Sequence, residues 1–189
     1  MSRLGGVLLT GGASVRLGVD KAGLTLDGET LADRALRALG VGCEPLVEVG
    51  PGWTSAPSVR EEPVGSGPLA GLVAGADALR AVGFAGPIVL LACDLPWVDP
   101  ALERLIAASP GVTAVPVDEH GRLQFVCARY SESALDRART LLGAGERSLH
   151  GLVSGLGPDV AELRDFPPGT FADIDVPADA RRAGIDLSR

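Results

Sequence analysis

The residues with the clearest chemical potential lie near the N-terminus, in the stretch VLLTGGASVRLGVDK at positions 7–21. Residues 7–10 are a short apolar run that predicts a buried parallel strand. Gly11 and Gly12 follow at once, and a glycine turn lets backbone N–H groups approach an anion closely, because no Cβ stands in the way. The same stretch carries two cations, Arg16 and Lys21. Phosphate is the commonest anion in such a cradle, so the stretch predicts a nucleotide phosphate loop.

Two better-known phosphate loops do not fit this stretch. A P-loop requires G-x-x-x-x-G-K-[ST], whereas Val19 and Asp20 intervene between the glycine and the lysine here. The Rossmann dinucleotide fingerprint requires G-x-G-x-x-G, and residues 11–13 do not supply it. The remaining alternative is a glycine-rich strand-to-helix turn whose charges are incidental.

Asp94 is the second position with a chemical role. It ends residues 88–93, the most apolar strand-like run of the chain, and ligands of open α/β sheets bind at the carboxyl ends of the strands. An unpaired buried charge is costly, so this carboxylate requires a cation. Mg²⁺ held by one or two carboxylates plus substrate phosphates is the usual arrangement. The alternative is that Asp94 caps the helix that follows.

Asp173 and Asp175 form an acidic pair near the C-terminus. At a spacing of two, their side chains point to the same side of an extended strand. If that side faces the cleft, Asp175 adds a second metal ligand. Otherwise the pair is a solvated strand end, and Asp175 caps the next helix.

The elements that must position these groups alternate between strand and helix patterns. Apolar runs predict strands at 7–10, 24–26, 46–49, 58–60, 88–93, 112–116, 123–129 and 160–163, with a further extended stretch at 171–176. Helical patterns cover a segment capped by Thr30, residues 69–79, a segment that Asp99 caps, and residues 133–142, 148–153 and 178–183. This alternation predicts one three-layer α/β/α domain over residues 1–189. Its sheet is mostly parallel, and a hairpin-like excursion at 112–129 makes it mixed.

Composition and charge exclude several classes of function. The chain of 189 residues is long enough for a sizeable core, and 46% hydrophobic with only 4% aromatic residues predicts a core of Ala, Val and Leu. The formal net charge of −7 argues against nucleic-acid binding through a basic surface. Neither a signal peptide nor an apolar run long enough to span a membrane is evident. Cys43, Cys93 and Cys127 are widely spaced and indicate reduced thiols in a cytoplasmic protein.

The N-terminal stretch resembles the nucleotidyltransferase signature L-x-G-G-x-S-x-R-x-G-x-D-K. The matching residues are Leu9, Gly11, Gly12, Ser14, Arg16, Gly18, Asp20 and Lys21. Within that superfamily, the chain looks most like the molybdenum cofactor guanylyltransferases. Residues 67–71 (GPLAG), 92–96 (ACDLP) and 145–147 (GER) are similar to further motifs of that family.

The resemblance implies a Rossmann-like nucleotidyltransferase fold and a reaction. A terminal phosphate oxygen of molybdopterin would attack the α-phosphorus of GTP and release pyrophosphate. Lys21 and Arg16 would balance charge on the departing phosphates, and Mg²⁺ on Asp94, with Asp175 as a further ligand, would hold the reacting ones. The implied nucleotide contacts are Leu9, Thr10, Gly11, Gly12, Lys21, Glu61, Gly67 and Asp94. Arg147 lies in the segment implied to contact the pterin, and transient contacts with molybdoenzymes or cofactor-synthesis proteins are implied as well.

The departures from the family pattern leave alternatives open. Glu61 stands where the family has an aspartate that recognises guanine, and FADIDVP at 171–177 replaces N-x-N-T-P, which the related cytidylyltransferases show as D-x-D-T-P. CTP or a sugar phosphate is therefore an alternative substrate, although Gly11-Gly12 favours GTP. A nucleotide-binding regulator without turnover is an alternative from another class. The presence of both Lys21 and Asp94 argues against it.

Overall fold

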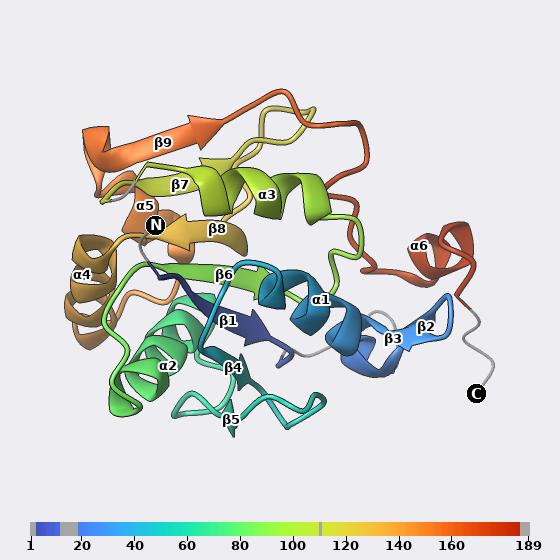
Figure 1. Ribbon diagram of the computed structural model, residues 1–189, viewed down its shortest axis with the longest axis horizontal. Helices are drawn as coiled ribbons and strands as arrows, with labels where there is room; N and C mark the ends of the chain where they lie inside the picture. The colour runs from blue at the N-terminus through green and yellow to red at the C-terminus, as the bar shows by residue number, and fades with distance from the viewer. Residues whose placement is uncertain (1–2, 12–18, 110, 186–189) are drawn as a thin grey trace.

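The structure is a computed structural model that describes residues 3–11, 19–109 and 111–185 (Figure 1). Its centre is a seven-stranded sheet with the strand order β5-β4-β1-β6-β8-β7-β9. The strands are β1 (Gly5–Leu9), β4 (Leu46–Val49), β5 (Ser58–Val59), β6 (Ile88–Ala92), β7 (Thr113–Pro116), β8 (Cys127–Tyr130) and β9 (Val160–Leu163). β8 runs antiparallel to β6 and β7, and the other neighbouring strands pair in parallel. The prediction of a mostly parallel, mixed sheet is confirmed.

Helices cover both faces of this sheet. α1 (Leu31–Gly40) and α3 (Asp99–Ala107) pack on one face, and α2 (Pro68–Ala81), α4 (Glu132–Gly143) and α5 (Leu149–Ser154) pack on the other. The side chains of β6 alternate between the two resulting cores: Val89 and Leu91 face α1 and α3, whereas Ile88 and Leu90 face the opposite helices. The three-layer α/β/α architecture is therefore confirmed.

A third, smaller core joins the two ends of the chain. The short hairpin of β2 (Thr25–Leu26) and β3 (Glu29–Thr30) lies beside α6 (Pro177–Arg182), as Figure 1 shows. The buried residues of this core are Leu24, Leu26, Leu31, Ile174, Ala180 and Ile185. It fixes the segment that carries the acidic pair against the segment that follows Lys21.

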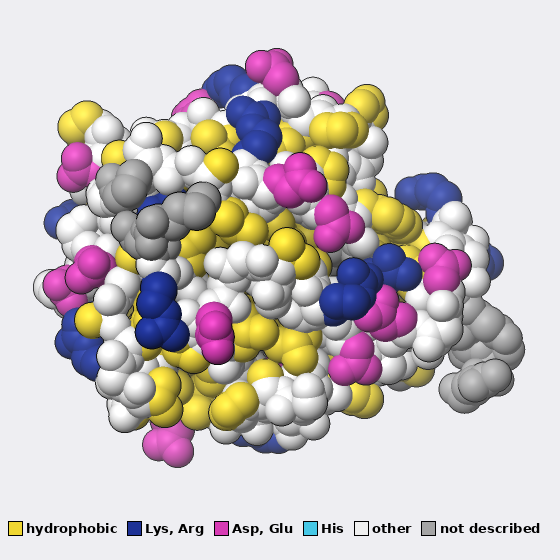
Figure 2. All heavy atoms as spheres, in the orientation of Figure 1, with side chains coloured by type: hydrophobic (Ala, Val, Ile, Leu, Met, Phe, Trp, Pro, Cys, Tyr) yellow, Lys and Arg dark blue, Asp and Glu magenta, His cyan; other side chains and the backbone are white. Residues whose placement is uncertain are grey.

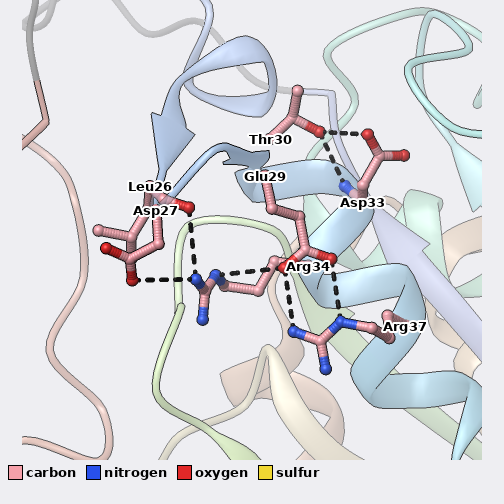
Figure 3. Close-up of polar contacts among 7 residues, drawn as sticks. All are labelled: Leu26, Asp27, Glu29, Thr30, Asp33, Arg34 and Arg37. Atoms are coloured by element: carbon pink, nitrogen blue, oxygen red, sulfur yellow. Dashed lines mark hydrogen bonds and ion pairs between the residues drawn. The ribbon is translucent and has the colours of Figure 1, made fainter.

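Charged side chains fasten the same hairpin to α1 (Figure 3). The carboxylate of Glu29 accepts hydrogen bonds from Nε and Nη2 of Arg37, at 2.9 and 3.0 Å. Arg34 donates to the carbonyl oxygen of Leu26 at 3.3 Å and lies 3.7 Å from Glu29. At the start of α1 the hydroxyl of Thr30 accepts from the backbone N–H of Asp33 at 3.0 Å, which confirms Thr30 as the N-cap.

The prediction of a strand at 123–129 is wrong in its first four residues. β8 begins only at Cys127, and before it a single bridge joins Val117 and Leu123. The reason is Asp118, a buried carboxylate that accepts from the backbone N–H groups of His120 and Arg122, at 2.9 Å each, and so folds this segment into a turn. The apolar residues at 123 and 125 pack on the core without joining the sheet.

Two boundaries near the acidic residues also differ from the prediction. Residues 172–175 form neither strand nor helix, so the argument from strand alternation does not apply to Asp173 and Asp175. α3 includes Asp99 as its first residue, and Val98 is its N-cap.

On the face shown in Figure 2, basic and acidic side chains are interspersed with apolar ones. Within the described ranges, no helix is long and apolar enough to cross a membrane.

Candidate active site

A cleft of about 730 Å³ opens at the carboxyl ends of β1, β4 and β6. This is the edge of an open α/β sheet where ligands are expected. Its walls come from the residues that follow these strands, from the start of η1 (Lys21–Gly23) and from the first turns of α2. The predicted residues that line it are Leu9, Thr10, Gly11, Lys21, Glu61, Gly67 and Asp94. Gly12 and Arg16 lie outside the described residues, as do Ser14 and Gly18 of the signature.

Lys21 and two of the predicted carboxylates meet at this cleft. Nζ of Lys21 donates to Oδ2 of Asp94 at 2.9 Å and to Oδ1 of Asp175 at 2.7 Å. The side chains are 16%, 23% and 35% exposed, so the ion pairs are partly shielded from water. Burial lowers the pKa of Lys21, but the hydrogen bonds and charges of Asp175 and Asp94 outweigh that effect and raise the pKa above 10.5. The amine is a cation at neutral pH.

Local structure explains how the chain brings these groups together. Asp20 caps η1 by accepting from the N–H of Ala22 at 3.1 Å, which fixes the turn that starts at Lys21. Asp94 lies two residues after the end of β6, and its carbonyl oxygen accepts from the N–H of Ile174 at 3.0 Å. That hydrogen bond holds residues 173–175 beside the end of the strand.

Both helix-cap alternatives are wrong. The N-cap of α3 is Val98, and the side chain of Asp94 is bonded to Lys21 instead. At α6 the carboxylate of Asp179 accepts from the N–H groups of Asp175 and Val176, at 3.2 and 3.0 Å. The side chain of Asp175 is therefore available to Lys21.

The donor set at this point suits a hard divalent cation. Asp94 and Asp175 place one oxygen each within 3 Å of a single cationic atom, the Lys21 ammonium, so the pair already brackets one positive charge. Asp173 lies close enough that burial, and then the charges of Asp94 and Asp175, raise its pKa. Carboxylate oxygens are the ligands that Mg²⁺ and Mn²⁺ prefer. Within the described ranges, no three His, Cys, Asp or Glu side chains form a ready metal site, so substrate oxygens would have to complete the shell.

The backbone of the predicted phosphate cradle is partly engaged already. The N–H groups of Thr10 and Gly11 donate to the carbonyl oxygen of Val49, at 3.1 and 3.3 Å. These two groups are bonded within the protein, which the sequence did not indicate. The predicted anion contact through Gly11 is thus occupied in this state of the molecule.

The segment around Gly67 is shaped by packing. Gly67 has a φ of 90°, and a Cβ there would lie 2.9 Å from the carbonyl oxygen of Arg147. A Cβ on Gly71 would lie 2.9 Å from a methyl group of Leu9. Glu61, on the opposite side of this turn, accepts from the N–H of Gly65 at 2.9 Å. The small residues let α2 approach β1 closely while still lining the cleft.

The side chain of Arg147, the predicted pterin contact, is bonded away from the cleft. Its Nη1 donates to the carbonyl oxygens of Leu142 and Glu146, at 3.0 and 2.9 Å, and so caps α4. Arg147 is not among the residues that line the cleft. A contact with a second substrate stays a prediction.

Sequence reasoning missed three residues at or near this site. Arg60 lines the cleft next to Glu61. Glu48, within the apolar strand β4, is completely buried and organises the loop that follows. Trp53, in that loop, donates through Nε1 to Asp20 at 3.2 Å. The composition also singles out Lys21, because it is the only lysine in the sequence.

Cys93, next to the metal candidate Asp94, is buried and therefore poorly suited to act as a nucleophile. Burial raises the pKa of Cys93 to about 12, so the thiol stays protonated at neutral pH. Burial does the same to Cys43 and Cys127.

The molecule is thus an open, mostly parallel α/β sheet with a cleft at the carboxyl edge of its strands, where a lysine is held between two carboxylates. The model of the MobA-like NTP transferase domain matches residues 6–158. The chain belongs to this family.

Individual proteins agree with that assignment. A probable molybdenum cofactor guanylyltransferase of Opitutus terrae is 39% identical over 167 residues, which cover 82% of this chain and 80% of that protein. Among solved structures, molybdopterin-guanine dinucleotide biosynthesis protein A of Archaeoglobus fulgidus has a TM-score of 0.73 at 24% identity, covering 95% of this chain and 96% of the other. A Mycobacterium tuberculosis protein solved in complex with manganese has a TM-score of 0.67 at 19% identity, covering 96% and 98%.

Proposed function

We propose that the chain transfers GMP from GTP to molybdopterin and releases pyrophosphate. The observation that carries the proposal is Lys21 held between Asp94 and Asp175 in the cleft of a chain of this family. The activity named for the Opitutus terrae relative supports it. A phosphate oxygen of the acceptor forms a bond to the α-phosphorus, and the bond from that phosphorus to the bridging oxygen breaks. No covalent enzyme intermediate is needed, since positioning and electrostatics supply the catalysis.

Lys21 supplies the fixed positive charge for the phosphates. Its amine remains protonated because Asp94 and Asp175 keep its pKa raised, although burial opposes this. When a triphosphate enters, the ammonium can exchange a carboxylate partner for a phosphate oxygen without leaving the cleft. Arg16 would add a second cation, as its place in the signature implies.

Asp94 and Asp175 would hold a divalent ion, Mg²⁺ being our proposal. Their oxygens already bracket one cation, and the manganese complex of the Mycobacterium tuberculosis protein supports a divalent metal in this fold. When bound, such an ion supplies Lewis-acid and template chemistry at the α-phosphate. Before such an ion binds, the ammonium of Lys21 offsets the negative charge of Asp94 and Asp175.

Glu61 would read the base. A carboxylate accepts from both N1–H and N2–H of guanine, and the side chain stands at the cleft wall near the start of α2. Arg60 beside it adds a donor that suits guanine O6 and N7. Cytosine lacks that pattern, which favours GTP, although the acidic pair at 173 and 175 keeps CTP as the alternative substrate.

A cytoplasmic location is part of the proposal. The three cysteines are unpaired, and oxidising compartments favour disulfides in secreted proteins.

The decisive experiment measures pyrophosphate release from GTP and molybdopterin against Mg²⁺ concentration. We expect Asp94→Asn to fold and to lower the rate by about 100-fold or more. Asp175→Asn should be milder, because the family pattern N-x-N-T-P, which residues 173–177 resemble, has asparagine at this position. Asp136→Asn, at an exposed site on α4, is the matched control and should behave as the wild type.

Three outcomes would count against the proposal. An Asp94→Asn enzyme with a normal rate and unchanged Mg²⁺ dependence would remove the metal assignment. Faster turnover with CTP than with GTP would show that the protein is a cytidylyltransferase, as the pattern at Asp173 and Asp175 suggests. GTP binding without pyrophosphate release would favour the non-catalytic regulator.

A further inference from the structure

Glu48 is an unusual residue for the middle of a buried strand. It lies in β4 with none of its surface exposed, although its neighbours Val47 and Val49 belong to the apolar core. A buried carboxylate is costly unless its oxygens are fully hydrogen-bonded. Those of Glu48 are. Oε1 accepts from the Thr10 hydroxyl at 2.5 Å and from the N–H groups of Gly52 and Trp53 at 2.9 and 2.8 Å.

The second oxygen completes the arrangement. Oε2 accepts from the N–H and the hydroxyl of Thr54, both at 2.8 Å. Burial raises the pKa of Glu48, but these hydrogen bonds outweigh it and hold the pKa below 4.5. The carboxylate is therefore ionised at neutral pH, and residues 52–54 are folded around it.

The loop that Glu48 organises reaches the turn that carries Lys21. A Cβ on Gly23 would lie only 2.7 Å from two ring atoms of Trp53, so the indole rests directly on η1. Nε1 of the same indole donates to Asp20 at 3.2 Å, and Asp20 is the residue that caps η1. The indole thus contacts η1 on both sides of Lys21.

Glu48 also contacts the residue that follows β1, since its Oε1 accepts from the hydroxyl of Thr10. Thr10 lines the cleft, as do Gly50 and Pro51 of the same loop. A Cβ on Gly50 would collide with the Thr10 hydroxyl. The two cleft walls are therefore in tight contact, with the carboxylate beneath them.

We propose that Glu48 is a positioning residue for the nucleotide site, acting through Thr10 on one wall and through Trp53 and Asp20 on the turn that presents Lys21. Glu48 does not line the cleft and touches no substrate. It folds the loop that braces η1, and η1 sets where the lysine ammonium lies. The inference rests on the proposed nucleotide binding at this cleft, and it adds Glu48 and Trp53, which lie outside the signature at positions 9–21.

Glu48→Gln is the sharpest test, because it keeps the shape of the side chain. Whichever way the new amide is turned, its NH₂ group faces N–H donors, either those of Gly52 and Trp53 or that of Thr54. One side of the loop must therefore loosen. We expect kcat/KM for GTP to fall by about 10- to 100-fold, the usual cost of removing a supporting hydrogen-bond partner, with KM for molybdopterin unchanged.

A tryptophan series separates the two contacts with η1. Trp53→Phe keeps a ring over Gly23 and removes the hydrogen bond to Asp20, whereas Trp53→Ala removes both. The loss of GTP affinity should grow in that order. Because the chain has two tryptophans, a Trp97→Phe background makes Trp53 the sole emitter, and adding Glu48→Gln should shift its emission to longer wavelength without any ligand.

Asp118→Asn is the matched control. Asp118 is also buried and also accepts backbone hydrogen bonds, but it organises the turn between β7 and β8 and does not line the cleft. It should lower the melting temperature and leave the Kd for GTP unchanged. If Glu48→Gln does only the same, Glu48 is a structural residue and the proposal is overturned.

The failures of the two proposals can be told apart. A wild-type protein that does not bind GTP would refute the proposed function, and the Trp53 emission would still test the positioning. Unchanged emission of Trp53 in the Glu48→Gln protein would overturn the inference regardless of activity.

Discussion

Replacing Lys21 by methionine tests the ion-pair cluster at the centre of the site. The change removes the charge and keeps most of the length of the side chain. It leaves Asp94 and Asp175, which are 23% and 35% exposed, without the ammonium that lies 2.9 and 2.7 Å from them. The protein should therefore lose stability as well as activity, in contrast to an ordinary surface lysine.

The magnitude follows from the burial of the three groups. Two unit charges 2.9 Å apart attract by about 6 kcal/mol at an effective dielectric constant of 20, but desolvation cancels most of this. Exposed pairs contribute about 1 kcal/mol or less, and breaking a fully buried pair costs about 3–5 kcal/mol. These partly exposed pairs should lie between, at about 2 kcal/mol. For a chain of this size that lowers the melting temperature by roughly 4–8 °C.

Differential scanning calorimetry without nucleotide measures the effect. Lys21→Met should melt earlier, and the triple variant that also carries Asp94→Asn and Asp175→Asn should recover most of the loss, because the two negative charges that the ammonium balanced are then removed as well. Added Mn²⁺ should stabilise Lys21→Met more than the wild type, since the ion no longer competes with the ammonium for the two carboxylates. A Lys21→Met protein as stable as the wild type, with the same response to Mn²⁺, would refute the reasoning.

Two further predictions concern other carboxylates of the molecule. Glu61→Gln should weaken GTP binding by roughly 10- to 100-fold and leave CTP binding nearly unchanged, because one donor of guanine then faces an amide N–H. Isothermal titration calorimetry with both nucleotides measures the two affinities. An equal loss for GTP and CTP would exclude a role of Glu61 in base recognition. Glu48 should stabilise the fold in a pH-dependent way. Its folded pKa is below 4.5, so its contribution is complete above that pH and is lost as the pH falls through the folded value. The difference in unfolding free energy between wild type and Glu48→Gln, from urea titrations, should therefore shrink on acidification; a difference independent of pH would contradict it.

The sequence was a good guide where the local pattern decides the structure. The apolar runs at 46–49 and 160–163 are strands with the predicted limits, whereas β6 ends at Ala92, one residue before the predicted end, so that Asp94 lies two residues past the strand and lines the cleft. A short apolar run is buried most readily as a strand inside the sheet, so the predicted and observed strands coincide at these two runs. The same local reasoning failed at 123–126. There the buried carboxylate of Asp118 accepts hydrogen bonds from the backbone N–H groups of His120 and Arg122, and the segment forms a turn before the strand begins.

The contacts of the site could not be predicted, because they join distant parts of the chain. Lys21 and Asp175 are 154 residues apart, and although the resemblance placed both at the reaction site, nothing in either segment indicated their direct ion pair. Glu48 was not singled out in the predicted strand at 46–49, since its burial depends on the loop that folds over it and donates to its carboxylate. A motif predicted that Arg147 contacts the pterin, but its guanidinium donates to the carbonyl oxygens of Leu142 and Glu146, in and just after the last turn of α4.

The pairing of Lys21 also determines how the protein reacts with electrophiles. Unprotonated amines attack acyl donors, and the charges and hydrogen bonds of Asp175 and Asp94 raise the pKa of Lys21, so its amine is protonated more completely at neutral pH than that of an ordinary lysine. Since the sequence has no other lysine, Lys21 carries the only primary amine among the side chains. Amine-directed labels should therefore react with the N-terminal amine faster than with Lys21. A label found on Lys21 would indicate that its ion pairs with Asp94 and Asp175 are broken.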